Sequence, residues 1–182
     1  MKFTEQKIKG VWVIEPKVFV DDRGYFMESY KQNLFEDHIG KVNFVQDNES
    51  KSTQGVLRGL HYQVGEHAQA KLVRVLMGAV LDVVVDIRKS SPSFGQYVAV
   101  ELTAENKKQL YVPRGFAHGF LVKSPEAIFT YKVDNPYAPN SDASILWSDP
   151  TLAIDWGMSE SELILSEKDR KGRLLADAIL FE

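Results

Sequence analysis

A long succession of short, strand-like segments between residues 42 and 133 limits the possible folds more than any other feature of this sequence. The segments are rich in β-branched and aromatic residues, and clusters of Gly, Pro and Ser separate them, as is usual for strands joined by turns. Such regular spacing, with almost no helical periodicity, predicts an all-β sandwich or barrel. The expected strands cover residues 44–46, 56–63, 71–77, 80–87, 97–102, 108–112, 117–122 and 128–133.

Weaker signals lie on both sides of this region. Residues 11–14 predict a further strand, and the turn Asp22-Arg23-Gly24 between two apolar segments predicts a β-hairpin. Apolar residues at helical spacing predict a short helix from Lys31 to Ile39. The same argument predicts a C-terminal helix over residues 166–179.

Length and composition exclude several classes of protein. A chain of 182 residues that is 44% hydrophobic predicts one domain over residues 1–182. Its formal net charge of -3 gives no general basic surface, so we expect neither nucleic acid nor a membrane as a partner. Without cysteine it can form no disulfide, thiolate metal site or cysteine nucleophile. No apolar run resembles a signal peptide or a membrane span, so we expect a soluble cytoplasmic protein.

His61 is the first candidate for chemistry, because it lies in an apolar, strand-like run with basic and phenolic neighbours. A histidine in such a run is more often a packed core residue, but nearby Arg58 and Lys71 favour a functional role. Strict alternation would put Arg58 and His61 on opposite faces of the strand. They can meet only where the strand bends, and Gly59 makes such a bend easy.

His118 is the second candidate, and its expected neighbours are Arg114, Tyr131 and Lys132. The run Gly55 to His61 resembles the first cupin motif, and Pro113-Arg114-Gly115-Phe116-Ala117-His118 resembles the second. Metal-binding cupins carry another histidine two residues after the first, where this chain has Gln63, and Glu66 is out of register for the carboxylate ligand. The resemblance therefore implies a cupin jelly roll without a metal. A metal-dependent cupin remains an alternative if Gln63 or Glu66 is a ligand.

Six ordered blocks give a narrower resemblance, to the dTDP-4-dehydrorhamnose 3,5-epimerase family, from about residue 3 to about residue 170. The family implies a double-stranded β-helix jelly roll and a homodimer whose nucleotide pocket draws on both subunits. It also implies a cofactor-free epimerisation of a nucleotide-linked 4-keto-6-deoxy sugar. The blocks are Asp22-Arg23-Gly24-Tyr25-Phe26-Met27-Glu28, Gln46-Asp47-Asn48-Glu49-Ser50, residues 55–63, Lys71-Leu72-Val73-Arg74-Val75, residues 113–120 and Leu165-Ser166-Glu167-Lys168-Asp169.

Epimerisation next to a ketone needs a base, a stabiliser for the enolate oxygen and an acid on the opposite face of the sugar ring. His61 suits the base because imidazole titrates near neutrality. Lys71 suits the oxygen because it can carry a positive charge, and Tyr131 suits the acid. By resemblance Asp169 orients His61, although Ser166 and Asp169 also have the spacing of a helix capping box. Asp82 and Asp86 are reserve candidates for that carboxylate.

A second group of residues is expected to bind the substrate. Arg23, Arg58, His118 and Lys168 can hold a pyrophosphate or sugar oxygens. Phe26 and Tyr137 can face the thymine or the sugar ring, and Asp142 stands near the place where the family usually has a glutamate. The resemblance adds the polar residues Glu28, Gln46 and Asn48.

The leading hypothesis is conversion of dTDP-4-dehydro-6-deoxy-D-glucose to dTDP-4-dehydro-L-rhamnose. An epimerase that acts at one carbon would use the same residues and is an alternative. A cupin that binds a nucleotide sugar without turning it over is a second alternative. A base and an acid in one chain argue against that second alternative, since binding alone requires neither.

Overall fold

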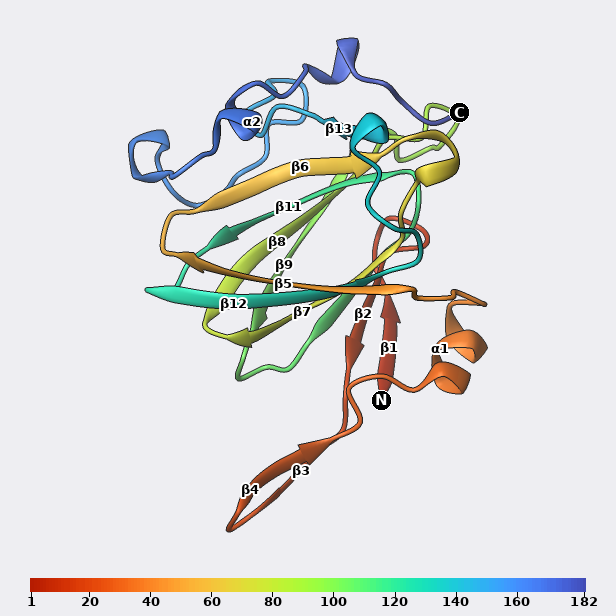
Figure 1. The fold of residues 1–182 in the computed structure, drawn as a ribbon, viewed down its shortest axis with the longest axis vertical. Helices are drawn as coiled ribbons and strands as arrows, with labels where there is room; N and C mark the ends of the chain where they lie inside the picture. The colour runs from red at the N-terminus through yellow and green to blue at the C-terminus, as the bar shows by residue number, and fades with distance from the viewer.

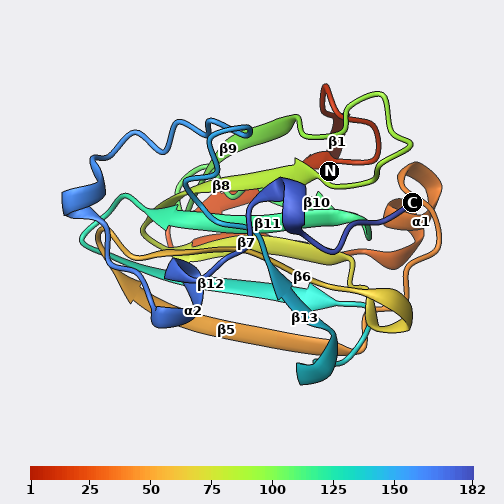
Figure 2. The same cartoon turned by 90° about the horizontal axis from the view of Figure 1, so that it is seen from above.

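Two facing antiparallel sheets form the body of the protein in a computed structural model that describes all residues, 1–182 (Figures 1 and 2). The first sheet has six strands, in the order β1 (Lys2–Glu5), β2 (Trp12–Glu15), β10 (Gln109–Val112), β7 (Lys71–Met77), β12 (Glu126–Val133) and β5 (Gln46–Thr53). The second has five, in the order β13 (Asp142–Ser144), β6 (Leu57–Gln63), β11 (Phe116–Val122), β8 (Ala79–Asp86) and β9 (Tyr97–Thr103). This arrangement confirms the predicted all-β jelly roll.

The alternation of side chains along each strand decides what lies between the sheets. On β8, Val80 and Val84 point inward into a core of 16 buried residues. Val83 and Val85 point outward and join a second core of 13 buried residues, which includes Trp156 and other C-terminal side chains. Figure 2 shows the C-terminal segment running across this outer face. Both faces of the five-stranded sheet are therefore covered, and the polar side chains of Asp82 and His118 on its inner face are deeply buried.

The first sheet is covered differently. Helix α1 (Gln32–His38) lies where the sequence predicted a helix, and its Phe35 packs against the outer face with Tyr111. The predicted hairpin is also present, as β3 (Val18–Asp21) and β4 (Gly24–Met27). It extends away from the body (Figure 1), and Phe26 on it is 67% exposed. No helix in the structure has the length and apolarity needed to cross a membrane.

Two predictions of secondary structure were wrong. The strand expected at 44–46 begins only at Gln46 and runs to Thr53 as β5. Its polar sequence lacks the apolar pattern used for the prediction. It is an edge strand and pairs only with β12. The helix expected over 166–179 is limited to α2 (Glu167–Arg170) and a 3₁₀ turn at Leu175–Asp177. Between them the main chain of Arg173 bonds to Ser144 and Leu146, because the extended chain finds hydrogen-bond partners there that a helix would lose. The short strands β1 and β13 were not predicted.

Candidate active site

A cavity of about 180 Å³ lies between the sheets on the side of β5 and β6. The residues predicted as base, oxyanion stabiliser and acid all line it: His61 on β6, Lys71 on β7 and Tyr131 on β12. His61 belongs to one sheet, whereas Lys71 and Tyr131 belong to the other, so a molecule in the cavity has the imidazole and the phenol on different sides. The remaining lining residues are Glu49, Ser50, Arg58, His118, Phe120 and Phe129.

An irregularity in β6 brings Arg58 and His61 onto the same face. His61 pairs with His118 on β11, but Arg58 pairs with Phe120, so the register shifts between the two pairs. Leu57 and Leu60 consequently share the outer core, while Arg58 and His61 share the cavity. The bend predicted at Gly59 is confirmed, and it needs glycine because a Cβ there would lie 2.6 Å from the Cα of Gly119.

His61 contacts Asp169, which is 3% exposed and comes from the start of α2. The distance from His61 Nε2 to Asp169 Oδ1 is 2.8 Å, although the ring N–H is not aligned with the oxygen. Asp169 also accepts from the Gly59 N–H and forms the capping box with Ser166. Burial alone would raise the pKa of Asp169, but these contacts hold it at about 2. Asp169 therefore does two things in the structure: it caps α2 and it faces the imidazole of His61.

A second imidazole–carboxylate pair lies deeper in the same cavity. Both oxygens of Asp82 contact His118 Nε2, at 2.9 and 3.0 Å, and Asp82 is fully buried. Burial raises the pKa of Asp82, and His118 opposes that effect. The reserve candidate Asp82 thus pairs with His118 and not with His61. A carboxylate in the valine-rich stretch of β8 was the sequence signal for this pair.

Lys71 places a partly buried cation next to these pairs. Its Nζ donates to the main-chain oxygen of His61 at 3.4 Å. Burial lowers the pKa of Lys71 to about 8, while the nearby carboxylates of Asp82 and Asp142 work against that shift. The ammonium is therefore available to neutralise a negative oxygen inside the cavity, and it is held there at the expense of its hydration.

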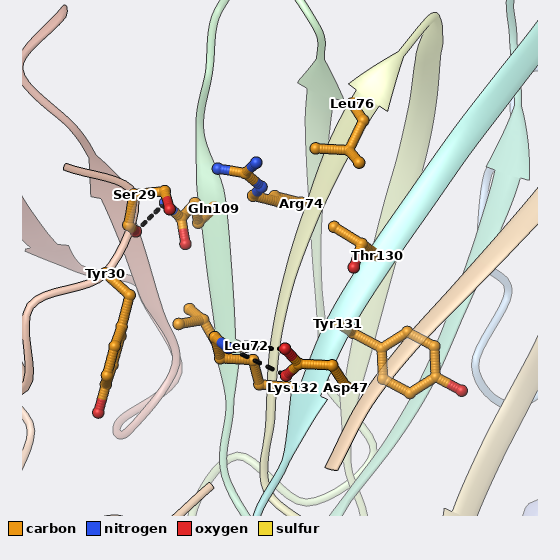
Figure 3. Close-up of a pocket in the computed structure, with 10 residues that line it drawn as sticks. All are labelled: Ser29, Tyr30, Asp47, Leu72, Arg74, Leu76, Gln109, Thr130, Tyr131 and Lys132. Carbon is orange, nitrogen blue, oxygen red and sulfur yellow. Dashed lines mark hydrogen bonds and ion pairs between the residues drawn. The ribbon is translucent and has the colours of Figure 1, made fainter. Parts of the chain in front are cut away.

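Tyr131 faces the cavity because alternation along β12 turns it away from its neighbours. Figure 3 shows Tyr131 leaving the strand on the opposite side from Thr130 and Lys132. Burial raises the pKa of Tyr131, with Arg58 opposing, so the phenol keeps its proton near neutrality. The sequence-based expectation that Lys132 lies near His118 was wrong, since Lys132 pairs with Asp47 on the outer face.

Several predicted binding residues lie near residues of this cavity without lining it. Tyr137 donates to Asp142 Oδ2 at 3.2 Å, and Lys168 forms an ion pair with the same carboxylate. Asn48 pairs with Tyr131, and Gln46 lies two residues before it on β5, so both side chains share the face of Tyr131. Gln46 and Asn48 are also hydrogen-bonded to each other at 2.7 Å.

Three predicted binding residues do not join the cavity within one chain. Arg23 is on the extended hairpin and pairs with Asp21. Phe26 lies on the same hairpin and is largely exposed, and Glu28 pairs with Lys31. The sequence predicted these residues at the nucleotide, in a pocket shared by two subunits. Within one chain they lie away from the cavity, because the hairpin points away from the sandwich (Figure 1).

Other expectations about His118 and the reserve carboxylates were also wrong. Arg114 pairs with Asp134 and does not line the cavity with His118. Asp86 bonds to Arg88 and to nearby serines, a structural role. Gln63 uses its amide on main-chain atoms of neighbouring loops. No group of three or more histidine, aspartate or glutamate side chains is arranged to hold a metal ion.

A second cavity, of about 240 Å³, lies on the outer face of the six-stranded sheet (Figure 3). Its polar groups are mostly paired: Lys132 with Asp47, and Gln109 with the main-chain oxygen of Ser29. Nη1 of Arg74 is buried there without a hydrogen-bond partner. Tyr131 lines both cavities, but the outer one contains no histidine, whereas the inner one contains His61, His118 and Lys71. The smaller inner cavity is therefore the candidate active site.

Comparisons with known proteins identify the family of this chain. A family model described as dTDP-4-dehydrorhamnose 3,5-epimerase matches residues 5–177. A Shigella flexneri protein named dTDP-4-dehydrorhamnose 3,5-epimerase is 54% identical over 182 residues, which are 100% of this chain and 99% of that protein. A crystal structure of dTDP-6-deoxy-D-glucose-3,5-epimerase from Legionella pneumophila, in complex with dTDP-4-keto-L-rhamnose, has a TM-score of 0.93 and 49% identity, covering 97% of this chain and 93% of that one.

A further crystal structure is that of dTDP-4-dehydrorhamnose 3,5-epimerase from Bacillus anthracis with TDP and PPi bound. It has a TM-score of 0.92 and 45% identity, covering 95% of this chain and 98% of that one. These three similarities extend over nearly the full length of both chains. The chain therefore belongs to the dTDP-4-dehydrorhamnose 3,5-epimerase family, as its six sequence blocks predicted.

Proposed function

We propose that this protein converts dTDP-4-dehydro-6-deoxy-D-glucose to dTDP-4-dehydro-L-rhamnose in dTDP-rhamnose biosynthesis, by inverting carbons 3 and 5 of the sugar. The observation that carries the proposal is the single cavity in which His61 and Tyr131 project from opposite sheets with Lys71 beside them. Family membership supports the reaction, and the Legionella relative in complex with dTDP-4-keto-L-rhamnose supports the substrate.

In the proposed mechanism, neutral His61 removes the proton from the carbon next to the ketone. The electrons of the broken C–H bond move to the ketone oxygen and form an enolate. Lys71 neutralises that oxygen, a kind of interaction that is typically worth about 3 kcal/mol. Asp169, whose pKa lies at about 2, remains ionised and balances the positive charge that forms on His61.

Tyr131 then donates its proton to the carbon from the other side of the ring, which inverts the configuration. The phenolate takes a proton from water and His61 loses one to water, so both are ready for the second carbon. The raised pKa of Tyr131 suits this role, because the proton leaves only when the enolate is present to accept it. The reaction as written uses side chains of the protein and water, and requires no cofactor.

The substrate's nucleotide part is proposed to extend out of the cavity, from Arg58, which lines it, towards Lys168 and Tyr137. The cationic side chains suit the pyrophosphate and the aromatic ring suits the thymine. Gln46, Asn48, Asp142 and His118 are proposed to bind polar atoms of the substrate.

We further propose a homodimer, in which Arg23, Phe26 and Glu28 bind the nucleotide held by the partner subunit. The hairpin supports this idea because its large apolar residues Phe19 and Val20 are 51% and 79% exposed, which is costly for an isolated chain. In a dimer these apolar side chains can be buried against the partner subunit. The arrangement would also explain why these residues lie far from His61 in one chain.

Incubation of the protein with dTDP-4-dehydro-6-deoxy-D-glucose in deuterated water tests the reaction. The expected result, measured by NMR, is incorporation of deuterium at carbons 3 and 5. Label at one carbon only would favour a single-position epimerase, and no label would leave a protein that binds the nucleotide sugar without turnover. A His61→Ala variant is the control: it should lose exchange and keep most of its TDP affinity.

A further inference from the structure

Gln63, the last residue of β6, has a buried side chain whose hydrogen bonds all go to main-chain atoms of other segments. Its side-chain nitrogen donates to the oxygen of His67 at 2.7 Å and to the oxygen of Pro136 at 3.2 Å. Its side-chain oxygen accepts from the N–H of Ala138 at 2.7 Å. The residue is 3% exposed, so water does not compete for these bonds.

The two loop atoms that Gln63 holds lie immediately before and after Tyr137. The Tyr137 ring itself is free on most of its surface: the residue is 57% exposed, and its only side-chain hydrogen bond is to Asp142. The direction of the ring therefore depends on the main chain at Pro136 and Ala138. Gln63 fixes that main chain on both sides, as a neighbouring strand would.

Other side chains attach the flanks of the same loop to residues 65–69. Asn135 donates to the main-chain oxygen of Glu66 at 2.7 Å, and Gln69 donates to the main-chain oxygen of Asn135 at 2.7 Å. Ser141 contacts His67 Nδ1 at 3.0 Å. These contacts hold both ends of the loop, whereas Gln63 is the side chain that holds its centre, next to the aromatic ring.

We propose that Gln63 is a positioning residue for the substrate: it orients Tyr137, whose partner Asp142 lies on β13 beside the strand of His61, and so sets the affinity for the nucleotide part. This rests on the proposed function. Gln63 stands two residues after His61, at the position where metal-binding cupins carry a second histidine. Here the side chain at that place anchors a binding loop.

A Gln63→Leu variant keeps the size of the side chain and removes all three hydrogen bonds. The N–H of Ala138 and the oxygen of Pro136 then lack their partners, and the loop can relax to reach water. Tyr137 loses its fixed direction, so TDP affinity and KM should each worsen by about tenfold, the scale of one base–aromatic stacking contact. The kcat at saturating substrate should change less than about threefold, because His61, Lys71 and Tyr131 are untouched.

The decisive test is a double-mutant cycle of Gln63→Leu and Tyr137→Ala, with TDP affinity measured by calorimetry and KM and kcat by NMR. If Gln63 acts through the ring, Gln63→Leu has no further effect on TDP affinity once Tyr137→Ala is present. Hydrogen exchange of the Ala138 amide should accelerate in Gln63→Leu. Additive effects on affinity, or an unchanged exchange rate at Ala138, would overturn the proposal.

Asp149→Ala is the matched control for general destabilisation. Asp149 is 2% exposed and also holds three main-chain N–H groups, of Thr151, Leu152 and Leu175, but it lies outside the cavity. This variant should lower the melting temperature and leave TDP affinity unchanged; an equal loss of affinity in Asp149→Ala would overturn a specific role of Gln63. If the unmutated protein binds TDP but exchanges no deuterium, the proposed reaction fails while the cycle on TDP affinity still tests Gln63.

Discussion

Replacing Lys71 by methionine should stabilise the fold while removing most of the activity. Burial lowers the pKa of Lys71 to about 8, from an ordinary value of 10.5, and neither Asp82 nor Asp142 cancels that effect. The folded protein thus keeps an ammonium ion in a place where the fold alone would favour an apolar side chain. Methionine has a similar length and adapts well to irregular space, so it should fit without strain.

The pKa of Lys71 also gives the size of its effect on stability and the direction in which that effect changes with pH. The difference between 10.5 and about 8 corresponds to about 3 kcal/mol, at about 1.36 kcal/mol per pH unit. Below pH 8 Lys71 is protonated in the folded and unfolded chains, and the full cost of burial is present. Between pH 8 and 10.5 the unfolded chain binds more protons, so the free energy of unfolding rises with pH across this window.

The expected gain for Lys71→Met at pH 7 is about 1–2 kcal/mol, less than the full difference, because Lys71 is only partly buried and solvent screens part of the cost. The rise in stability between pH 8 and 10.5 should disappear. Turnover should fall by about 10²- to 10³-fold, the effect of removing one donor to a developing oxyanion. Activity of the unmutated protein should likewise decline as pH rises through about 8, since the neutral amine cannot stabilise the enolate.

Urea unfolding followed by tryptophan fluorescence, at pH 7 and pH 10 and at one protein concentration, measures the stability. Deuterium exchange measures the activity. Lys71→Arg is the control: it keeps a buried positive charge and should give no gain in stability. A Lys71→Met variant that is less stable than the unmutated protein at pH 7, or that keeps the rise between pH 8 and 10.5, would refute the reasoning.

Four further predictions concern other parts of the site. Tyr131→Phe should lower kcat by about 10²- to 10⁴-fold without changing the melting temperature by more than a few degrees, measured by NMR turnover and calorimetry. The contacts of Asp169 hold its pKa at about 2, although burial would raise it. The free energy of unfolding of the unmutated protein should therefore fall by about 2 kcal/mol as pH falls from about 4 to 2, and an acid titration of Asp169→Asn should lack this loss. Gly59→Ala should cost more than about 2 kcal/mol in urea unfolding, since its Cβ would meet the Cα of Gly119 at 2.6 Å; a normal midpoint would contradict the close approach. Phe26→Ser should weaken the proposed dimer in sedimentation experiments and lower TDP affinity, and unchanged sedimentation and affinity together would argue against the shared site.

Much of the sandwich could be predicted because its signals are local. Alternating β-branched residues and turn residues determine where β7, β8, β11 and β12 begin and end, to within one or two residues. The polar strand β5 escaped prediction, because an edge strand with one polar face lacks the apolar alternation that marks the others. The C-terminal helix was wrong for the opposite reason: residues with helical spacing are held in an extended form by the tertiary contacts of Arg173.

The candidate site likewise has features that the sequence determined and features that only the tertiary structure determined. By itself the sequence determined which residues have the chemistry of a base, a cation and an acid, and its ordered blocks determined the family. Only the tertiary structure decided that His118 belongs with Asp82, that Arg58 and His61 share a face, and that Gln63 holds the loop of Tyr137. Chemical type and strand periodicity are carried by neighbouring residues, whereas these three contacts depend on a register shift and on the packing of segments far apart in the chain, which no local pattern specifies.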